Sequence, residues 1–270
     1  MIVAGLKQAL VFASFGVSEE RARKASLEAT AALLQESFPA FSLFQAYTSG
    51  FIRRRLQGQG IVVPDLLGLL QRLAKQGYSR VLIQPSHLTP GEEFDNKVLA
   101  AAEAAKPLFA DGLAVGRPVF DEPEDYVQVL ETMLPELSLQ EDESLVWFGH
   151  GSPHHHNPVY ERLQQTADDR RLPVHVGVLE PSDTPDFAMV CRRLENCGAK
   201  KILLAPLLLS GGSHVLRDMA GDGENSWKNR LAAAGCYVRT DLRGLGEHPA
   251  FRELYAGKAA RCLKQQGWET

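Results

Sequence analysis

Short runs of apolar and β-branched residues alternate along this chain with longer amphipathic runs. The short runs predict strands at Gln8–Phe15, Ser42–Tyr47, Arg80–Pro85, Leu113–Val115, Ser144–Phe148, Val174–Val178, Lys201–Pro206 and Tyr237–Thr240. The longer runs predict helices at Ser18–Ser37, Pro64–Gln76, Glu92–Phe109, Glu124–Leu134, Pro158–Arg170, Thr184–Asn196, Ser226–Ala234 and Pro249–Gln266. Because strands and helices alternate regularly, we expect an α/β protein whose parallel sheets are covered by helices on both faces.

Residues at the predicted helix ends agree with these boundaries. Ser18 is the expected N-cap of the first helix, where acidic residues also favour the positive end of the helix dipole. Gly77, Gly198 and Gly235 each follow a helical run and precede a strand, the usual position of a C-cap glycine.

The two halves of the chain resemble each other. Lys75–Pro85 aligns with Asn196–Pro206 at a constant offset of 121 residues, and the same register pairs Glu93 with His214. The segments Ala13-Ser-Phe-Gly16 and Phe148-Gly-His-Gly151 also correspond and occur in the same order. We therefore expect two similar α/β lobes related by a pseudo-twofold internal duplication.

A polar, acidic stretch at Pro135–Ser144 separates the two predicted lobes. The expected N-terminal lobe spans residues 1–135. The expected C-terminal lobe spans residues 144–270, with its last helix free to pack back on the N-terminal lobe.

Ligands of open α/β sheets bind beyond the carboxyl ends of the strands. The duplication places Phe15, Glu93, His150 and His214 just after strands, and Glu180 follows the strand Val174–Val178. Neutral imidazole is a common ligand of cobalt, nickel, zinc and iron, so His150 and His214 with a carboxylate are chemically suited to a metal site. The alternative is that these side chains only satisfy backbone groups of the loops.

The remaining histidines are weaker candidates. Gly151 and Pro153 make a helix across His150–His154 improbable, so the triplet His154–His156 is expected to form a solvated loop that could still pass on a metal ion. His87, His175 and His248 are expected to have structural roles.

Common nucleotide and nucleophile motifs are missing from the sequence. There is no Walker A sequence, G-x-S-x-G elbow, HExxH or dinucleotide GxGxxG after a strand. Gly211-Gly-Ser213 could wrap a phosphate through its backbone amides, and it would equally let a planar ligand approach the backbone closely. The basic run Phe51–Leu56 is either a solvated helix face or a clamp for a polycarboxylate substrate, with Arg53–Arg55 as its cations.

Composition excludes several classes of protein. The chain has 270 residues and a formal net charge of −4, which argues against sequence-independent nucleic-acid binding. No run of about 18 apolar residues predicts a membrane span. The four cysteines form no CxxC pair, and the N-terminus lacks the basic region of a signal peptide, so we expect a cytoplasmic protein without a membrane partner.

A further set of motifs occurs in order along nearly the whole chain. They are Ala13-Ser-Phe-Gly16, Ala46-Tyr-Thr-Ser-Gly50 followed by Ile52-Arg53, Gln76-Gly-Tyr78, Gly91-Glu-Glu-Phe94, Gly149-His-Gly151, Val176-Gly-Val-Leu-Glu180, Gly212-Ser-His214, Asp218-Met-Ala220, Asp222-Gly-Glu-Asn-Ser-Trp-Lys228 and Gly244-Leu-Gly-Glu247. This set resembles the anaerobic sirohydrochlorin cobaltochelatases of the CbiK type, a branch of the class II chelatases. The resemblance implies the same two-lobed, chelatase-like fold that the repeat predicts.

The resemblance implies specific roles for the candidate residues. His150, His214 and Glu180 would bind the metal, and Glu93 corresponds to the acidic residue that the family places across its cleft. His150 or Glu93 would accept the two pyrrole protons. His150 could do so only while it does not hold the metal, because a metal-bound nitrogen cannot also take a proton. Phe15, Ser49, Arg53, Arg54 and Gly212 would bind the substrate. The His154–His156 triplet departs from relatives, which often have fewer histidines there, and leaves the route of metal delivery open.

The implied activity is insertion of Co²⁺ into sirohydrochlorin in anaerobic cobalamin biosynthesis, a lyase reaction with no organic cofactor. Co²⁺ would be a substrate, with Ni²⁺, Fe²⁺ or Zn²⁺ as ions that the same donors accept in vitro. Insertion of Fe²⁺ for sirohaem or of Ni²⁺ is the close alternative, since the donor types suit all of these metals. A non-catalytic carrier of metal or tetrapyrrole is the alternative from another class. The sequence also allows a homo-oligomer.

Overall fold

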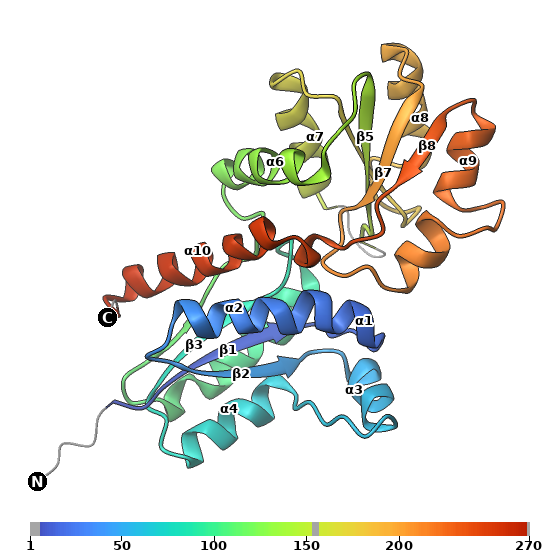
Figure 1. Ribbon diagram of the computed structural model, residues 1–270. Helices are drawn as coiled ribbons and strands as arrows, with labels where there is room; N and C mark the ends of the chain where they lie inside the picture. Colours follow the sequence, from blue (N-terminus) through green and yellow to red (C-terminus); the bar gives the residue numbers. More distant parts are fainter. Residues whose placement is uncertain (1–5, 153–156, 269–270) are drawn as a thin grey trace, which may run out of the picture. The chain divides into compact units, whose positions relative to one another are not determined.

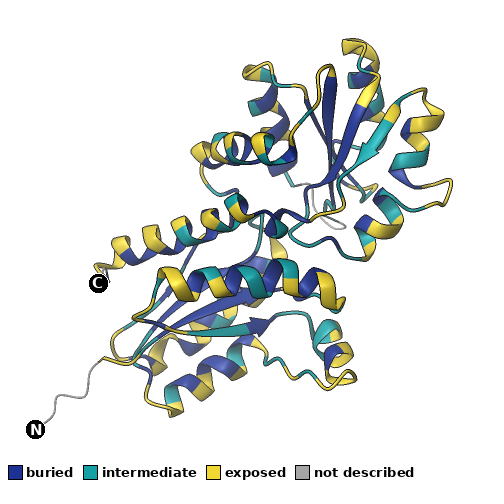
Figure 2. Ribbon diagram, viewed as in Figure 1, coloured by how far each residue is buried: buried dark blue, intermediate teal, exposed yellow. Residues whose placement is uncertain are grey.

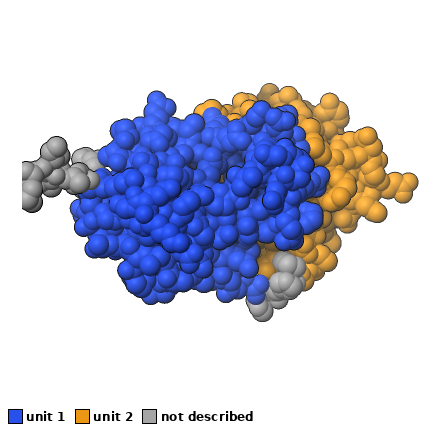
Figure 3. Space-filling view, turned by 90° about the horizontal axis from the view of Figure 1, so that it is seen from below, with its two compact units in different colours: residues 1–121, 252–270 blue, residues 122–251 orange. Residues whose placement is uncertain are grey.

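The computed structural model describes residues 6–152 and 157–268, so the His154–His156 triplet lies outside the described residues. The chain divides into two compact units (Figure 3). The first unit comprises Met1–Asp121 and Arg252–Thr270, and the second comprises Glu122–Phe251. The change of unit comes before the predicted separator at Pro135–Ser144, because helix α6 (Pro123–Leu137) already belongs to the second unit.

The first unit contains a four-stranded parallel sheet with the order β2-β1-β3-β4. Its strands are β1 (Gln8–Ser14), β2 (Ser42–Tyr47), β3 (Arg80–Pro85) and β4 (Leu113–Val115). Ala13 of β1 is in register with Ala46 of β2 and Pro85 of β3. The segments that follow these three strands therefore leave the sheet at one edge.

The second unit repeats this topology with the order β6-β5-β7-β8 (Figure 1). Its strands are β5 (Glu143–Gly149), β6 (Val174–Val178), β7 (Lys201–Pro206) and β8 (Tyr237–Thr240), all parallel. Every predicted strand is present, within one residue at each end. The equivalent strand orders confirm the expectation of two similar α/β lobes.

Helices cover both faces of each sheet (Figure 1). The helical segments of the first unit are α1 (Glu20–Arg23), η1 (Lys24–Glu28), α2 (Ala29–Ser37), α3 (Gly50–Gln57), α4 (Leu66–Lys75), η2 (Phe94–Leu99), α5 (Ala100–Ala105) and η3 (Lys106–Leu108). Those of the second unit are α6, α7 (Val159–Asp169), α8 (Phe187–Cys197), η4 (His214–Met219), α9 (Trp227–Ala233) and η5 (Leu245–Glu247). Helix α10 (Pro249–Gln266) begins in the second unit and continues in the first.

Three helical features differ from the sequence predictions. Helix α3 was not among the predicted helical ranges, although a helix face was one of the two interpretations of Phe51–Leu56, and its N-cap is Ser49. The first helix is capped by Glu19 and not by Ser18, because the Glu19 carboxylate accepts hydrogen bonds from the backbone amides of Arg21 and Ala22. The segments η1, η2 and η4 are π-helical, with one extra residue per turn.

Each unit has its own apolar core between sheet and helices, and the central strands β1, β3, β5 and β7 are almost entirely buried (Figure 2). In the second unit, Trp227 packs edge-on against Phe148 at a centroid distance of 5.0 Å. A β-carbon at Gly177 would lie 2.5 Å from Val190 Cγ2 and 2.7 Å from Trp227 Cη2, so only glycine fits this position of β6.

Helix α10 contributes to the core of the first unit. Tyr255 is fully buried, its ring lies 5.9 Å from that of Phe12, and its hydroxyl donates a hydrogen bond of 2.7 Å to the Ser86 carbonyl. The core of this unit is therefore completed by residues from the far end of the chain. No helix in residues 6–152 and 157–268 is long and apolar enough to cross a membrane.

Candidate functional site

His150 and Glu180 lie at the carboxyl edge of the second sheet. The backbone amides of Leu179 and Glu180 donate hydrogen bonds of 2.9 Å to the carbonyls of Gly149 and His150, which ties the segments after β5 and β6 together. His150 Nδ1 lies 3.8 Å from Glu180 Oε1 and 3.1 Å from the Gly151 carbonyl oxygen. Gly151 has a φ of +81°, and a β-carbon there would lie 3.1 Å from Glu180 Cβ. A glycine turn thus allows the two predicted ligands to approach each other.

His214 comes from the segment after β7, as the first residue of the π-helical turn η4. Its ring centroid lies 4.8 Å from that of His150, with the ring planes at 86°. The side chains of His150 and His214 are 38% and 41% exposed, which leaves both accessible to an ion from solvent. The structure therefore brings the two predicted histidine ligands together.

Asp218 is a neighbour of this pair that the sequence analysis did not assign to the site. Its Oδ2 lies 2.8 Å from His214 Nδ1, one helical turn further along η4. Burial alone would raise the pKa of Asp218, but hydrogen bonds from Arg217 and His214 outweigh it and hold this pKa below its usual value. The spacing His214-x-x-x-Asp218 was the available signal, since residues four apart share a helix face.

The three predicted donors are of the types that bind divalent transition metals. Within the described ranges, no group of three His, Cys, Asp or Glu side chains is already arranged around one point. Two imidazoles and one carboxylate suit cobalt, nickel, iron or zinc. Glu180 Oε1 lies on the Nδ1 side of the His150 ring.

Glu93 belongs to the first unit, directly before the π-helical turn η2. The Thr48 hydroxyl donates a hydrogen bond of 2.5 Å to Glu93 Oε1. Thr48 is itself fixed, because its backbone amide donates to the Ser14 carbonyl at 2.8 Å. Glu93 and His214 are repeat counterparts, and each stands at the start of a π-helical turn in its own unit. Such turns are frequent at functional sites.

Four of the five predicted substrate-binding residues are also in the first unit. Phe15 is 52% exposed, and its carbonyl accepts a hydrogen bond of 3.2 Å from the Ser49 amide. The Ser49 hydroxyl caps helix α3, which carries Arg53 and an exposed Arg54. Arg53 Nη1 lies 3.6 Å from Asp65 Oδ2.

Gly212, in the second unit, is the fifth predicted substrate-binding residue. A β-carbon there would meet nothing within 4 Å, whereas one at Gly211 would lie 2.3 Å from the Leu242 carbonyl oxygen. Packing therefore requires glycine at position 211, and the space beside Gly212 is open.

A hollow of about 370 Å³ in the first unit adjoins Glu93 through Thr48. Arg53, Asp65, Asn96 and Lys97 also line it. Asn96 and Lys97 follow Glu93 by three and four residues and were not among the predicted site residues. The hollow therefore contains two cations and one carboxylate, and Arg53 is paired with that carboxylate, Asp65.

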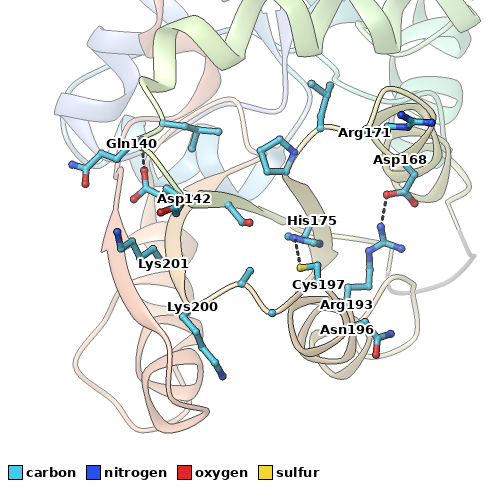
Figure 4. A pocket seen from close by; sticks show the side chains of 17 residues that line it. Gln140, Asp142, Asp168, Arg171, His175, Arg193, Asn196, Cys197, Lys200 and Lys201 are labelled. Carbon is cyan, nitrogen blue, oxygen red and sulfur yellow. Dashed lines mark hydrogen bonds and ion pairs between the residues drawn. The ribbon is translucent and has the colours of Figure 1, made fainter.

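A second hollow, of about 1030 Å³, lies at the amino edge of the second sheet (Figure 4). His175 Nε2 and Cys197 Sγ lie 3.8 Å apart in its wall. Burial and the nearby Arg193 lower the pKa of His175 to about 4, so its ring is neutral. His175 is near the start of β6 and Glu180 lies beyond its end, so this hollow is at the opposite edge from the predicted ligands and contains none of the predicted site residues.

Solved structures of chelatases share this fold. SirB from Bacillus subtilis with Fe³⁺ superposes with a TM-score of 0.60 at 17% identity, covering 97% of this chain and 98% of that chain. The cobalt complex of SirB from the spizizenii subspecies gives a TM-score of 0.55 at 14% identity, covering 96% of both chains. At these identities the likeness shows the fold.

Sequence relatives define the family. A curated sirohydrochlorin cobaltochelatase from Salmonella typhimurium is 36% identical over 260 residues, which cover 96% of this chain and 97% of the relative. The sirohydrochlorin cobaltochelatase CbiKC of Nitratidesulfovibrio vulgaris is 30% identical over 251 residues, covering 92% and 88%. The model of the cobalt chelatase (CbiK) family matches residues 8–263. The chain therefore belongs to the cobalt chelatase (CbiK) family.

Proposed function

We propose that this protein inserts Co²⁺ into sirohydrochlorin and releases two pyrrole protons. The observation that carries the proposal is the pairing of His150 and His214 at the carboxyl edge of the second sheet, with ring centroids 4.8 Å apart. Two full-length relatives named as sirohydrochlorin cobaltochelatases support the choice of substrates.

In this proposal, His150, His214 and Glu180 hold the incoming ion. Asp218 occupies the Nδ1 side of His214, so His214 binds through Nε2. Three protein donors replace part of the hydration shell and leave an open coordination face for the nitrogens of the macrocycle. Because these donors suit several metals, Fe²⁺ and Ni²⁺ remain the competing substrates, and Zn²⁺ is a further ion for assays in vitro.

Glu93 is the proposed acceptor of the pyrrole protons. Its Oε1 is engaged by the Thr48 hydroxyl, which fixes the carboxylate and leaves Oε2 to take a proton. His150 can serve as an acceptor only before it holds the ion or after it has released it.

The first unit is the proposed site for the periphery of the macrocycle. The exposed Phe15 offers an apolar surface to the ring, while Ser49 fixes the start of α3 and with it Arg53 and Arg54. Gly212 leaves open space for the ring at the start of η4. We place one carboxylate of sirohydrochlorin in the 370 Å³ hollow, where Lys97 supplies positive charge and Arg53 is shared with Asp65.

The proposed location is the cytoplasm, since Cys191, Cys197, Cys236 and Cys262 are all free thiols, as is usual in reducing compartments. A homo-oligomer is compatible with the proposal. The competing hypothesis is a carrier that binds metal or tetrapyrrole without turnover. A carrier has no need of a fixed carboxylate such as Glu93.

Mixing the purified protein with sirohydrochlorin and Co²⁺ under anaerobic conditions tests the proposal. We expect the spectrum of the metallated ring to appear far faster than without protein, and His150→Ala or His214→Ala to abolish most of this rate. Replacement of His154–His156 by alanine should leave a substantial part of it. Equal rates with and without protein would favour the carrier hypothesis. Parallel assays with Fe²⁺ and Ni²⁺ would identify the preferred metal.

A further inference from the structure

Asp218 is the nearest charged neighbour of His214 on the turn η4. We propose that Asp218 is a positioning residue that keeps the Nδ1 proton on His214 and thereby directs the Nε2 lone pair toward the incoming metal ion. This inference rests on the proposed role of His214 as a metal ligand. It adds a residue whose function neither the motif set nor the relatives' names specify.

The geometry of η4 supports this role. Oδ2 of Asp218 lies 2.8 Å from Nδ1 of His214, a normal length for a hydrogen bond to a carboxylate. The Asp218 side chain is 26% exposed, so the contact is partly shielded from water. Asp218 is also held from its other side, since Arg217 Nε donates to Oδ1 at 3.2 Å. The carboxylate is therefore fixed in place before any metal arrives.

The chemistry of the pair determines which nitrogen binds the ion. An ionised carboxylate can only accept hydrogen bonds, and a neutral imidazole has a single N–H. The contact to Asp218 therefore places that proton on Nδ1 and leaves Nε2 with its lone pair. Metal-binding histidines usually direct their second nitrogen to a carboxylate or carbonyl in this way, and loss of that partner typically weakens metal binding by about 10- to 100-fold.

The equivalent turn of the first unit shows that this contact is not a general feature of the repeat. The offset of 121 residues pairs Asp218 with Lys97 and His214 with Glu93. Glu93 is held by Thr48 from another strand end, and Lys97 lines the neighbouring hollow. Both units therefore have a π-helical turn at this position. In η4 the turn also brings the carboxylate of Asp218 against the ring of His214, the proposed ligand.

The test measures Co²⁺ binding to the protein alone, by titration calorimetry, for wild type, Asp218→Ala and Asp218→Glu. We expect Asp218→Ala to weaken binding by about 10- to 100-fold and Asp218→Glu to recover part of the loss. The matched control is Asp222→Asn, which removes a fully exposed carboxylate that pairs with Lys228 at 3.3 Å. If Asp222→Asn changes the Co²⁺ affinity by less than about twofold, a general loss of negative charge is not the cause of the weaker binding in Asp218→Ala.

Steady-state kinetics distinguish positioning from a purely structural role. In Asp218→Ala, the KM for Co²⁺ should rise while the KM for sirohydrochlorin stays within about twofold of wild type. A structural defect would instead lower kcat and change both KM values together.

The tautomer of His214 in the metal-free wild type is an independent readout, measured by long-range ¹H–¹⁵N NMR. The inference requires Nδ1–H, so a wild-type spectrum with Nε2–H would overturn it even if the variants failed to fold. A folded Asp218→Ala protein that binds Co²⁺ as tightly as wild type would also overturn the inference about Asp218. If His214→Ala loses Co²⁺ binding in that case, the proposed function stands without the inference. Unchanged binding in His214→Ala would instead refute the ligand assignment on which both rest.

Discussion

Replacing Glu93 by glutamine removes the proposed proton acceptor with little change in shape. The Thr48 hydroxyl donates to Glu93 Oε1 at 2.5 Å, and the amide oxygen of a glutamine can accept the same hydrogen bond. The variant therefore keeps the side chain in position and loses the ability to take up a proton. This makes Glu93→Gln a cleaner test than truncation to alanine, which would also leave Thr48 without its partner.

The expected loss follows from the usual contribution of a positioned general base. Such a group typically supplies about 10²- to 10⁴-fold in rate, equivalent to about 3–5 kcal/mol of transition-state stabilisation. We expect Glu93→Gln to lower kcat for cobalt insertion by at least about 100-fold and to leave the KM for Co²⁺ within about twofold. The adjacent exposed carboxylate provides the control, since Glu92→Gln should stay within about twofold of wild type in both parameters.

The assay is the initial rate of metallated product, followed by absorbance under anaerobic conditions with Co²⁺ varied at saturating sirohydrochlorin. A Glu93→Gln enzyme that retained more than a tenth of the wild-type kcat would refute the assignment of Glu93 as the proton acceptor. A raised KM for Co²⁺ with an unchanged kcat would point instead to a role for Glu93 in holding the ion.

Three further predictions concern stability and substrate binding. Gly177→Ala should destabilise the protein by about 1–3 kcal/mol and lower its melting temperature, because the added methyl group would lie 2.5 Å from Val190 Cγ2. The control Gly223→Ala has open space around it and should melt at the wild-type temperature. Burial lowers the pKa of His87 from 6.5 to about 4, so protonation favours the unfolded chain and its contribution to stability is lost as the pH falls below 6.5. Between pH 7 and pH 5, His87→Leu should therefore lose about 2 kcal/mol less than wild type in chemical denaturation, and an unchanged pH dependence would contradict this. Lys97→Gln should raise the KM for sirohydrochlorin by about twofold to fivefold and leave Co²⁺ binding unchanged in calorimetry, whereas an effect confined to metal binding would exclude the hollow as a carboxylate site.

The central strands could be predicted because burial on both faces of a parallel strand requires a short continuous apolar run. Residues 144–148 of β5, for example, are buried without exception, and the pattern Ser-Leu-Val-Trp-Phe is visible in the sequence. Helix α3 was harder to recognise because its basic run Arg53–Arg55 leaves little apolar periodicity, and Leu56 is its only fully buried position. The predicted cap at Ser18 failed because the carboxylate of Glu19, one residue later, reaches two backbone amides.

The candidate ligands were found from strand ends and the repeat, and the structure adds their surroundings. The pairing of His150 with His214 depends on a glycine turn and on a π-helical turn, and neither geometry has a clear sequence signature. Asp218 and Lys97 lie outside the strand-end rule because a helical turn, not a strand, carries them beside the site. The chain changes unit between residues 121 and 122, ahead of the predicted separator. The polar, acidic segment Pro135–Ser144 contains the end of helix α6, so in the structure it marks the end of a helix and not a change of unit.

The path of the chain also determines the order in which the two units can complete their cores during synthesis. The second unit is one uninterrupted segment, residues 122–251, whereas the first is completed only by residues that follow it. Until α10 has been made, the apolar surface around Phe12 lacks Tyr255, which covers it in the finished protein. At about 5–20 residues per second, translation of the intervening segment leaves that surface open for roughly ten seconds. The unit that carries the candidate histidines can therefore complete its core before the first unit does, although its residues are synthesised later.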